Sequence, residues 1–383
     1  MRDLILVVVA LLSACSAQPY GIEATPKEGD PKLVLVTIDG LRWQEVFRGA
    51  DAELAANTTY VERHEHVARS YVDVSDRAAA LMPFLQELAQ QGVLIGNRDA
   101  GSCAEVSNPW WFSYPGYNEI LSGRADAAID SNDKVENPNL TFLEWLEQRA
   151  DFAGAVAAFG SWDVFPYIIN EARSGVPVNA GFEPLHADAE DGELRTLNRL
   201  QSELPSPWET VRFDAFTHEF ALWTLRHEYP RAVYIAYGET DDFAHDGKYD
   251  AYLDSAHRSD GFLRELWQTL QSDPYYAGQT TLLVTTDHGR GDAADESWRS
   301  HASPAAMRGP MKQYAEHFPD GIRGSDQTWI AAIGPQISAA DAGQYRDGQC
   351  AHNAQMAATA LRALQLRAAD FSTEAEPALN IFK

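Results

Sequence analysis

Three apolar, β-branched runs in this chain lead directly into acidic corners, and this pattern constrains the fold more than any other feature. The runs and the aspartates that follow them are KLVLVTI with Asp39, AVYIAY with Asp241 and TLLVTT with Asp287. Runs of this length and composition are typical of buried strands in a parallel sheet. In open α/β sheets ligands bind at the carboxyl ends of the strands. We therefore expect the three aspartates to lie along one edge of a sheet.

Two of these corners also carry a histidine. Asp241 and His245 are four residues apart, and Asp287 directly precedes His288. Either spacing lets both side chains reach one metal ion. A single aspartate after a strand is usually a turn or capping residue, and Asp-His-Gly also makes an ordinary turn. Three such corners together instead indicate a metal site. Asp242 is an alternative ligand to Asp241, but the four-residue spacing to His245 favours Asp241.

The rest of the chain alternates between predicted helices and strands. Helices are expected at 83–91, 141–150, 213–228, 263–270 and 353–366, and further strands at 93–95, 155–159 and 329–333. This alternation predicts an α/β protein whose central sheet is mostly parallel and covered by helices on both faces. Residues 32–383 form one predicted domain. The region from about 125 to 210, part of which is rich in Gly, Pro, Asp and Asn, is predicted to be an inserted loop or cap.

The charge balance limits the possible partners. The chain of 383 residues has 56 acidic and 30 basic side chains, which gives a formal net charge of −26. Nucleic-acid duplexes and anionic membrane surfaces both attract cationic faces, so neither is expected as the main partner. A small molecule is the expected substrate.

The N-terminal residues have the features of an export signal rather than of a folded element. Residues 1–17 combine one arginine, an apolar stretch and small residues, which is typical of a signal peptide. Leu12-Ser13-Ala14-Cys15 also resembles a bacterial lipobox, which predicts lipidation of Cys15 as the only membrane contact; plain secretion with cleavage after Ala17 is the alternative. Residues 18–31 would then be a tether. The protein is expected in the periplasm or anchored at the outer membrane, where Cys103 and Cys350 could pair, although the sequence leaves that pairing open.

A serine ahead of a predicted helix is the candidate nucleophile. Pro115 is typical of a first helical turn and Gly123 of a helix end, which puts Ser113 at the helix N-terminus. A serine there is most often a simple cap, but the position also favours an anion. Coordination to a metal would lower its pKa and make it a nucleophile. The aromatic residues Trp110, Trp111 and Phe112 either line a pocket or belong to the core, and the core is favoured.

Together these motifs resemble the alkaline phosphatase superfamily, nearest to its nucleotide pyrophosphatase/phosphodiesterase and cofactor-independent phosphoglycerate mutase branches. Ser113-Tyr114-Pro115-Gly116 stands where those phosphodiesterases have Thr-Phe-Pro-Asn. The Asp-Gly, Asp-x-x-x-His and Asp-His-Gly motifs follow in the family order. The family also has a last histidine ahead of a strand that ends in Gly-Pro. His301 is the best match to it, with His317 and His352 as weaker alternatives.

The resemblance implies a ligand set and a reaction. One ion would be held by Asp241, His245 and His301, and the other by Asp39, Asp287, His288 and Ser113. Zinc is expected for such mixed ligands, and manganese is possible. The implied activity is hydrolysis of phosphate mono- or diesters through a phosphoserine on Ser113. A phosphotransferase or mutase of the same superfamily and a non-catalytic, metal-binding surface lipoprotein are the alternatives.

The sequence departs from the family pattern at one position after the nucleophile. Gly116 replaces the asparagine of the phosphodiesterase motif, and Asn118 is expected to supply an amide to the phosphoryl group instead, unless it is a plain capping residue. The sulfatase branch has an arginine at the position of Tyr117, so sulfate ester cleavage by the formylglycine route is not expected.

Overall fold

The computed structural model describes residues 29–186, 191–338, 345 and 349–383. The predicted signal peptide, with the lipobox at Cys15, and nearly all of the tether lie outside the described residues. Among the residues that are described, no helix is both long and apolar enough to cross a membrane.

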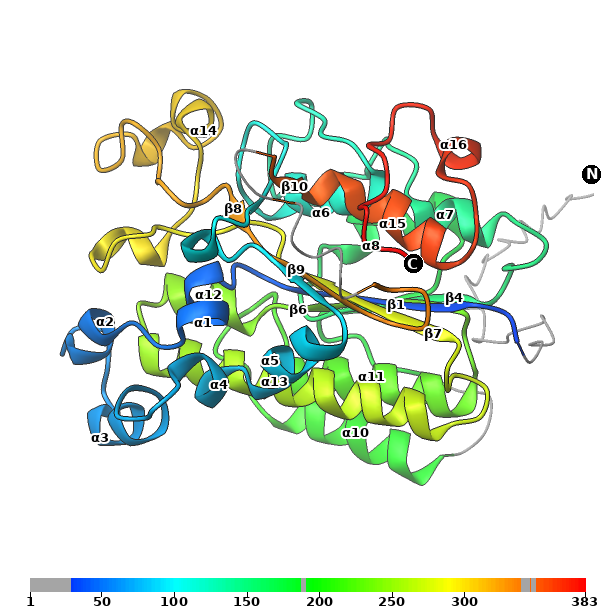
Figure 1. The fold of residues 1–383 in the computed structure, drawn as a ribbon, viewed down its shortest axis with the longest axis horizontal. Coiled ribbons are helices and arrows are strands. Elements are labelled where there is room, and N and C mark those ends of the chain that lie inside the picture. The colour runs from blue at the N-terminus through cyan, green and yellow to red at the C-terminus, as the bar shows by residue number, and fades with distance from the viewer. Residues whose placement is uncertain (1–28, 187–190, 339–344, 346–348) are drawn as a thin grey trace, which may run out of the picture.

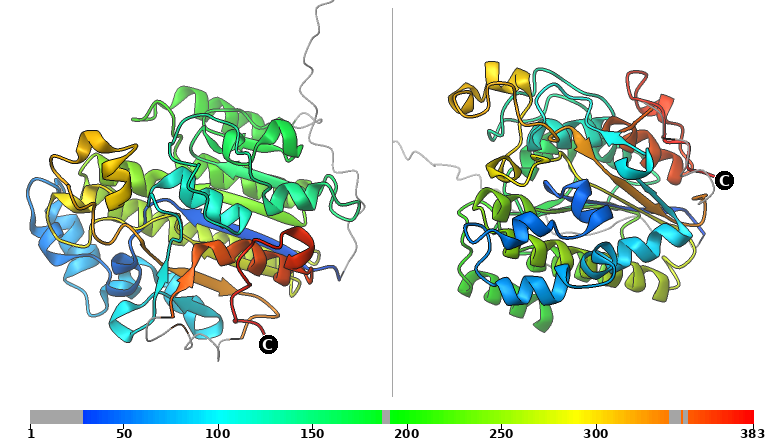
Figure 2. Two further views of the ribbon diagram at one scale, coloured as in Figure 1. Left: turned by 90° about the horizontal axis from the view of Figure 1, so that it is seen from above. Right: turned by 60° about the vertical axis from the view of Figure 1, so that its left-hand side comes forward.

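A seven-stranded sheet forms the centre of the molecule, with the strand order β2-β9-β7-β1-β6-β4-β5. Its strands are β1 (Lys32–Ile38), β2 (Val93–Ile95), β4 (Val156–Gly160), β5 (Val178–Ala180), β6 (Ala232–Tyr237), β7 (Thr280–Thr285) and β9 (Ile330–Ile333). The five strands from β7 to β5 are parallel, whereas β9 pairs antiparallel with β7 and β2 antiparallel with β9. Figure 2 shows β1 in blue between its neighbours. The predicted α/β fold with a mostly parallel sheet is confirmed.

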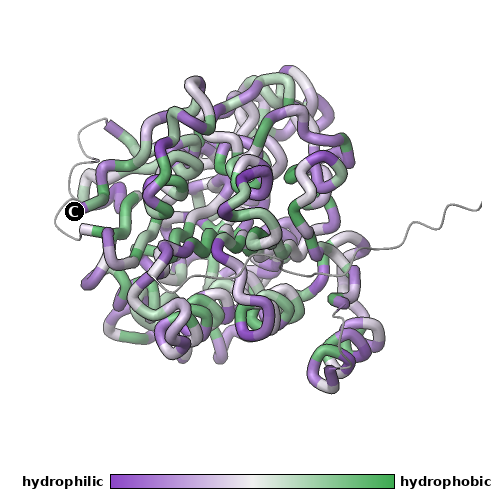
Figure 3. Tube along the Cα trace, turned by 90° about the vertical axis from the view of Figure 1, so that its right-hand side faces the viewer, coloured by the Kyte–Doolittle hydropathy of each residue, from purple (hydrophilic) through white to green (hydrophobic). Residues whose placement is uncertain are grey.

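Helices cover both faces of this sheet (Figure 1). On one face lie α5 (Pro83–Gln91), α10 (Gly192–Glu203), α11 (Asp214–His227) and α13 (Tyr249–Ser272), and on the other α6 (Ser113–Ser122), α7 (Phe142–Glu147), α8 (Phe165–Ile168) and α15 (Met356–Ala363). Strand β1 is buried along its whole length, with Val34 and Val36 in one core and Leu33 and Leu35 in the other. Alternate side chains point to opposite faces of a strand, so a strand between two helical layers must be apolar throughout. The apolar strands accordingly run through the middle of the hydropathy-coloured tube (Figure 3).

Shorter elements surround the carboxyl edge and the periphery. They are α1 (Trp43–Arg48), α2 (Ala52–Ala56), α3 (His64–Val67), α4 (Arg77–Leu81), α9 (Glu171–Ser174), α12 (Glu239–His245), α14 (Pro304–Arg308) and α16 (Ala368–Phe371). A second, three-stranded sheet has the order β10-β3-β8, with β3 (Ala104–Glu105), β8 (Gln327–Thr328) and β10 (Ala351–His352). The disulfide Cys103–Cys350 directly precedes the paired residues Ala104 and Ala351 of this small sheet.

Two expectations about the organisation of the chain need correction. The stretch from about 125 to 210 is not an inserted cap, because it supplies β4 and β5 to the central sheet. The strand predicted at 155–159 is β4, whereas the three residues of β5 do not stand out among polar loops and depend on pairing with β4. The helix predicted at 263–270 is also much longer and begins at Tyr249. The polar residues of its first half and Gly261 mask the helical pattern, while packing against α5 and α12 stabilises it.

Candidate active site

Three adjacent strands deliver the predicted acidic residues to one place. Strand β1 lies between β7 and β6, so Asp39 after β1 is next to Asp287 after β7. Helix α12, which follows β6, brings Asp241 and His245 to the same edge. Two groups of side chains here have ligand atoms within 4.8 Å of one another: Asp39, Asp287 and His288 in one, and Asp241, His288 and His301 in the other. Parallel neighbours end at the same edge, and this explains why residues more than 200 positions apart meet.

Asp39 and Asp287 each have one anchored oxygen and one oxygen with no hydrogen bond. The Tyr117 hydroxyl donates to Asp39 Oδ2 at 2.7 Å, and the Gly40 amide donates to Asp287 Oδ1 at 3.1 Å. The buried Oδ1 of Asp39 and Oδ2 of Asp287 accept none; they lie 3.4 and 3.3 Å from His288 Nε2. Buried carboxylate oxygens normally have partners, so this pair fits a cation shared with His288.

The second group is arranged around Asp241. Its carboxylate lies 3.2 Å from His245 Nε2 and 3.5 Å from His301 Nε2, and the two imidazole nitrogens are 3.1 Å apart. One aspartate and two histidines with their ligand atoms turned toward one another are a typical donor set for zinc. The side chain of His245 is 45% exposed, whereas that of His301 is 4% exposed. The site therefore opens to solvent on the side of His245.

Hydrogen bonds at the far ring nitrogens fix the orientation of two of these imidazoles. His288 Nδ1 lies 2.8 Å from the carbonyl oxygen of Gly289, and His301 Nδ1 lies 3.2 Å from that of Trp111. Because a carbonyl only accepts, each Nδ1 carries a proton and donates it. In the neutral ring the Nε2 atom that faces the carboxylates is then free to bind a metal. Metal-binding histidines are commonly oriented in this way.

The electrostatics of the cluster also fit bound cations. Burial, together with the charge of Asp241, raises the pKa of Asp39, and burial with the charge of Asp39 raises that of Asp287 well above its usual range. Burial opposes a charge on His288, but Asp287 and Asp39 outweigh it and raise the pKa of His288 to about 9. The protein's own groups thus supply less positive charge than these carboxylates need. Divalent ions would meet that need.

Ser113 reaches the same cluster from α6, a helix that covers one face of the sheet. It is the first residue of α6, and its Oγ lies 3.3 Å from His288 Nε2. The helix N-terminus favours an anion next to it. Trp111, two residues earlier, has left-handed backbone with φ of 61°. Such a conformation is costly for a large side chain and clusters at functional sites.

Close packing explains two glycines at the site. Gly40 has φ of 57°, and a Cβ there would lie 2.7 Å from both Asp241 Oδ1 and Arg290 Nη1. A Cβ on Gly116 would lie 2.4 Å from the carbonyl oxygen of Asp287. Helix α6 therefore rests directly on the Asp-His-Gly corner, and this contact brings Ser113 to His288. The contact also explains why the asparagine of the phosphodiesterase motif is absent at position 116.

The prediction that Asn118 faces a ligand is wrong, and Asn132 lies at the cavity instead. Asn118 is fully buried; its Oδ1 accepts hydrogen bonds from Asn137 and Asn139, and its Nδ2 donates to the Arg124 carbonyl. Asn132 instead lines the cavity at Ser113, and its Oδ1 accepts a hydrogen bond of 3.0 Å from the Tyr114 amide. That bond leaves its NH₂ group for a ligand. Position 132 lies in a polar loop without periodicity, and nothing in the sequence marks it.

The sequence did not reveal two further residues that contact the carboxylates of the cluster. Tyr117, one helical turn after Ser113, bonds Asp39. Arg290 is buried; its guanidinium pairs with Asp241 and also donates to the Trp298 and Arg299 carbonyls. The spacing of Tyr117 from Ser113 is a detectable signal, because residues four apart share a helix face. His301 is in the cluster, whereas His352 pairs with Glu376 outside it, and neither His352 nor His317 lines the cavity.

A cavity of about 260 Å³ opens above Ser113. Its lining combines polar residues from the cluster with apolar residues from the segment that follows His301. The lining residues are Ser113, Asn132, Asp241, His245, Ser300, His301, Met307, Met311, Tyr314, Phe318 and Ile322.

Similarity to solved structures identifies the fold. The alkaline phosphatase PafA matches with a TM-score of 0.58 at 10% identity, over 94% of this chain and 100% of that one. A 2-O GAG sulfatase matches with a TM-score of 0.54 at 12% identity, over 91% and 73%. The lipoteichoic acid synthase LtaP from Listeria monocytogenes matches with 0.52 at 10%, over 92% and 79%. No family model matches the chain, and no curated protein sequence does. The chain therefore has an alkaline-phosphatase-like fold, as the resemblance of its motifs predicted.

Proposed function

We propose that this protein is a metal-dependent hydrolase of phosphate mono- or diesters with Ser113 as its nucleophile. The observation that carries the proposal is the position of Ser113 Oγ, 3.3 Å from His288 Nε2, at the mouth of a buried carboxylate–imidazole cluster. The fold neighbours include a phosphatase, a sulfatase and a synthase, so the fold alone does not choose the reaction. The choice among these reactions therefore rests on the residues of the site.

Seven residues would hold the ions in this proposal. Asp241, His245 and His301 would bind one ion, and Asp39, Asp287, His288 and Ser113 the other. Zinc fits the mixed imidazole and carboxylate donors, and manganese is the alternative. When bound, the two ions would lower the pKa of the serine hydroxyl and offset negative charge on the phosphoryl group.

The protein's own groups have distinct tasks in the reaction. Ser113 Oγ attacks phosphorus, the bond from phosphorus to the leaving oxygen breaks, and the alcohol departs with a proton. Water then cleaves the phosphoserine and releases the phosphate product. Asn132 would donate its NH₂ group to a phosphoryl oxygen, while the N-terminus of α6 stabilises negative charge near Ser113. Tyr117 and Gly40 keep Asp39 and Asp287 in place throughout.

Acid quenching during turnover tests this mechanism. The purified protein is mixed with bis-p-nitrophenyl phosphate, quenched, digested and analysed by mass spectrometry. We expect one p-nitrophenyl phosphoryl group on the peptide that contains Ser113, since only one of the two nitrophenyl groups leaves in the first step, and two divalent ions per chain by elemental analysis. Turnover without label on that peptide would refute the nucleophile, and fewer than two ions would refute the ligand assignment. Parallel reactions with p-nitrophenyl phosphate and p-nitrophenyl sulfate compare monoester and sulfate cleavage.

Transfer to an alcohol is the second candidate, because a phosphoserine can be attacked by any hydroxyl that reaches it. The cavity opens beside the 45% exposed His245, so water has a route to Ser113. This opening favours hydrolysis over transfer. Phosphate release that stays the same when glycerol is added would support hydrolysis, whereas glycerol phosphate as the main product would indicate a transferase.

We also propose that the protein is exported. The Cys103–Cys350 disulfide supports an oxidising compartment. The predicted lipid at Cys15 would anchor the domain through the 18–31 tether. Mass spectrometry of the N-terminal peptide from native membranes tests the anchor against plain secretion.

A further inference from the structure

We infer that the apolar side of the cavity binds a compact apolar ester group on phosphorus. The preferred substrate would then be a phosphodiester with a short alkyl or single aryl ester. This inference rests on the proposed function and narrows its substrate class. It concerns one surface, called here the apolar wall, made of Met307, Met311, Tyr314, Phe318 and Ile322.

The apolar wall comes from the segment between His301 and β8. This segment contains α14 and stands at the carboxyl edge of the sheet, in orange at the upper left of Figure 1. Met307 and Ile322 are buried with Phe112, the residue directly before Ser113, and Met311 and Phe318 pack against them. The wall is therefore anchored next to the nucleophile, and its inner residues share one small core with the chain that leads into α6.

The wall leaves apolar surface facing a polar site. Tyr314 is 55% exposed, one of few large hydrophobic residues so exposed among those described. Methionine adapts its shape and often lines sites for apolar ligands. The same cavity is also lined by the polar groups of Ser113, Asn132 and His245. A few polar groups opposite an apolar surface are the usual composition of a ligand site, in which the polar groups orient the ligand.

The charges around the cavity favour a diester over a monoester. Among the described residues that line the cavity there is no lysine or arginine. Arg290 is buried behind the lining and already engaged by Asp241 and two carbonyl groups. A phosphate monoester carries up to two negative charges near neutral pH, and a diester carries one. Apart from the ions of the proposed function, the described lining supplies no cation for the second charge of a monoester, and in a chain of net charge −26 this suits the diester.

The size of the cavity limits the apolar group. Its volume is about 260 Å³, just below the range of about 300–1,000 Å³ that is typical of ligand pockets. A dry cavity of about 150 Å³ holds benzene. The space above Ser113 therefore fits a phosphoryl group with one ring or a short chain, rather than a polymer segment.

The test compares diesters that share a leaving group. Wild type is assayed on p-nitrophenyl methyl phosphate and p-nitrophenyl butyl phosphate, so that only the retained ester differs. We expect kcat/KM for the butyl ester to exceed that for the methyl ester by at least about tenfold, because added methylenes are buried against the wall. In Tyr314→Ser and Phe318→Ala this ratio should fall to about threefold or less. Thermal unfolding of each variant checks that it folds.

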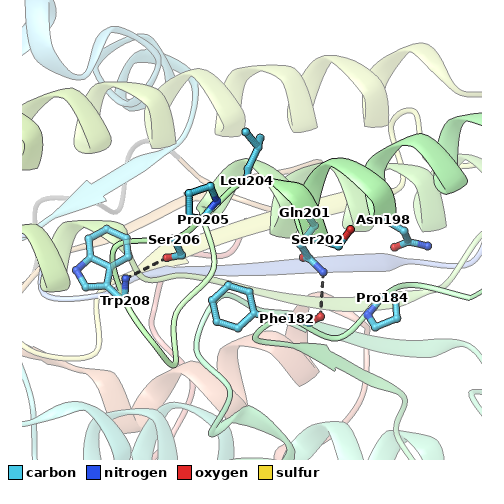
Figure 4. Close-up of a pocket in the computed structure, with 9 residues that line it drawn as sticks. All are labelled: Phe182, Pro184, Asn198, Gln201, Ser202, Leu204, Pro205, Ser206 and Trp208. Carbon is cyan, nitrogen blue, oxygen red and sulfur yellow. Dashed lines mark hydrogen bonds between the residues drawn. The ribbon is translucent and has the colours of Figure 1, made fainter.

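A second hollow provides the matched control. It has a volume of about 500 Å³ and is lined by Phe182, Leu204 and Trp208 with smaller residues, and neither Ser113 nor any proposed metal ligand lines it (Figure 4). Leu204 is 51% exposed, similar to Tyr314. Leu204→Ala should keep the wild-type butyl-to-methyl ratio.

The outcomes separate this inference from the proposed function. If wild type cleaves neither these diesters nor p-nitrophenyl phosphate, the proposed function fails; if it cleaves only p-nitrophenyl phosphate, the inference fails while the proposed function stands. If it cleaves both esters equally well, or if the folded wall variants keep the wild-type ratio, the inference fails while the proposed function stands. A loss of the ratio in Leu204→Ala as large as in the wall variants would also overturn it.

Discussion

The carboxylate–imidazole cluster and the apolar wall both contribute residues to the cavity above Ser113, yet they are built in opposite ways. Asp39, Asp287 and His288 follow central strands and are at most 5% exposed. The apolar wall comes from a segment with only short helices, and Tyr314 in it is more than half exposed. Strand ends are rigid because both neighbours are paired, whereas an irregular segment has fewer hydrogen bonds to hold it. Chemistry that needs accurate geometry is therefore expected in the cluster, and substrate selectivity in the wall.

The largest expected effect comes from removing the nucleophile beside the cluster. Ser113→Ala should lower kcat on bis-p-nitrophenyl phosphate by at least about 10³-fold, because the covalent intermediate on Ser113 can no longer form. Ser122→Ala is the control at the other end of α6, where the hydroxyl only bonds the Arg124 carbonyl. Steady-state kinetics on both variants measure the difference. A wild-type rate in Ser113→Ala would show that the chemistry does not depend on this serine, and the contrast between a catalytic cluster and a selective wall would fail.

A pair of adjacent carboxylates tests which residues belong to the cluster. Asp241 contacts His245, His301 and Arg290, whereas burial and the charge of Asp241 raise the pKa of Asp242 to about 9, which favours its neutral form. Asp241→Asn should leave about one tightly bound ion and reduce kcat at least about 100-fold. Asp242→Asn should retain two ions. Elemental analysis after dialysis against a chelator distinguishes the two variants, and the reverse result would reassign the ligand.

The disulfide offers a change that leaves both regions chemically intact. Cys103 and Cys350 are 247 residues apart and tie the small sheet together. Opening so long a loop should lower the free energy of unfolding by about 3–5 kcal/mol. Urea unfolding of Cys103→Ser against wild type measures the loss, with wild type in reducing buffer as the control. We expect the butyl-to-methyl selectivity to survive below the transition, since no wall residue touches the bridge.

The smallest expected effect is a pH-dependent change in stability, and it involves the segment between the small sheet and Ser113. Glu119 of α6 accepts hydrogen bonds from the Ser107 and Asn108 amides, and Asn108 in turn caps the Trp110 and Trp111 amides. Burial raises the pKa of Glu119 to about 7, from 4.5. The folded state then holds a proton that the unfolded state has released, so this residue's contribution to stability falls as pH rises from about 4.5 to about 7.

Glu119→Gln tests this pH dependence. The wild type should lose up to about 3 kcal/mol more than the variant between pH 5 and pH 8, because glutamine does not ionise. Urea unfolding of both proteins at each pH gives the double difference, in which titration of all other groups cancels. Parallel pH profiles for the two proteins would show that Glu119 titrates normally in the folded state.

Much of the cluster could be predicted because its ligands lie next to strong local signals. Buried strands in a parallel sheet are apolar on both faces, so an aspartate at the end of such a run stands out. The Asp-x-x-x-His and Asp-His spacings depend only on local geometry. His301 was identified through the family resemblance, which implies a histidine ahead of the strand that ends in Gly334-Pro335. These residues meet in the structure as the sequence predicted.

Other parts of the site carry no such signal. Asn132 was missed in favour of Asn118 because both are polar residues near a helix, and only the burial of Asn118 against Asn137 and Asn139 separates them. The apolar wall was not predicted either, because Met307 and Ile322 join Phe112 across nearly 200 positions of sequence. No local pattern marks the part of 125–210 that forms β5, because β5 has only three residues and depends on pairing with β4.

The sequence by itself determined the α/β class, the aspartates and histidines at the strand ends and the serine at a helix start, because each depends on local periodicity and short spacing. Only the tertiary structure decided how these parts meet. It laid α6 on the Asp287 backbone through Gly116, and it placed Asn132 and an apolar wall at the same cavity as Ser113. Such contacts join residues far apart in the chain, and their energy comes from packing that no local pattern encodes.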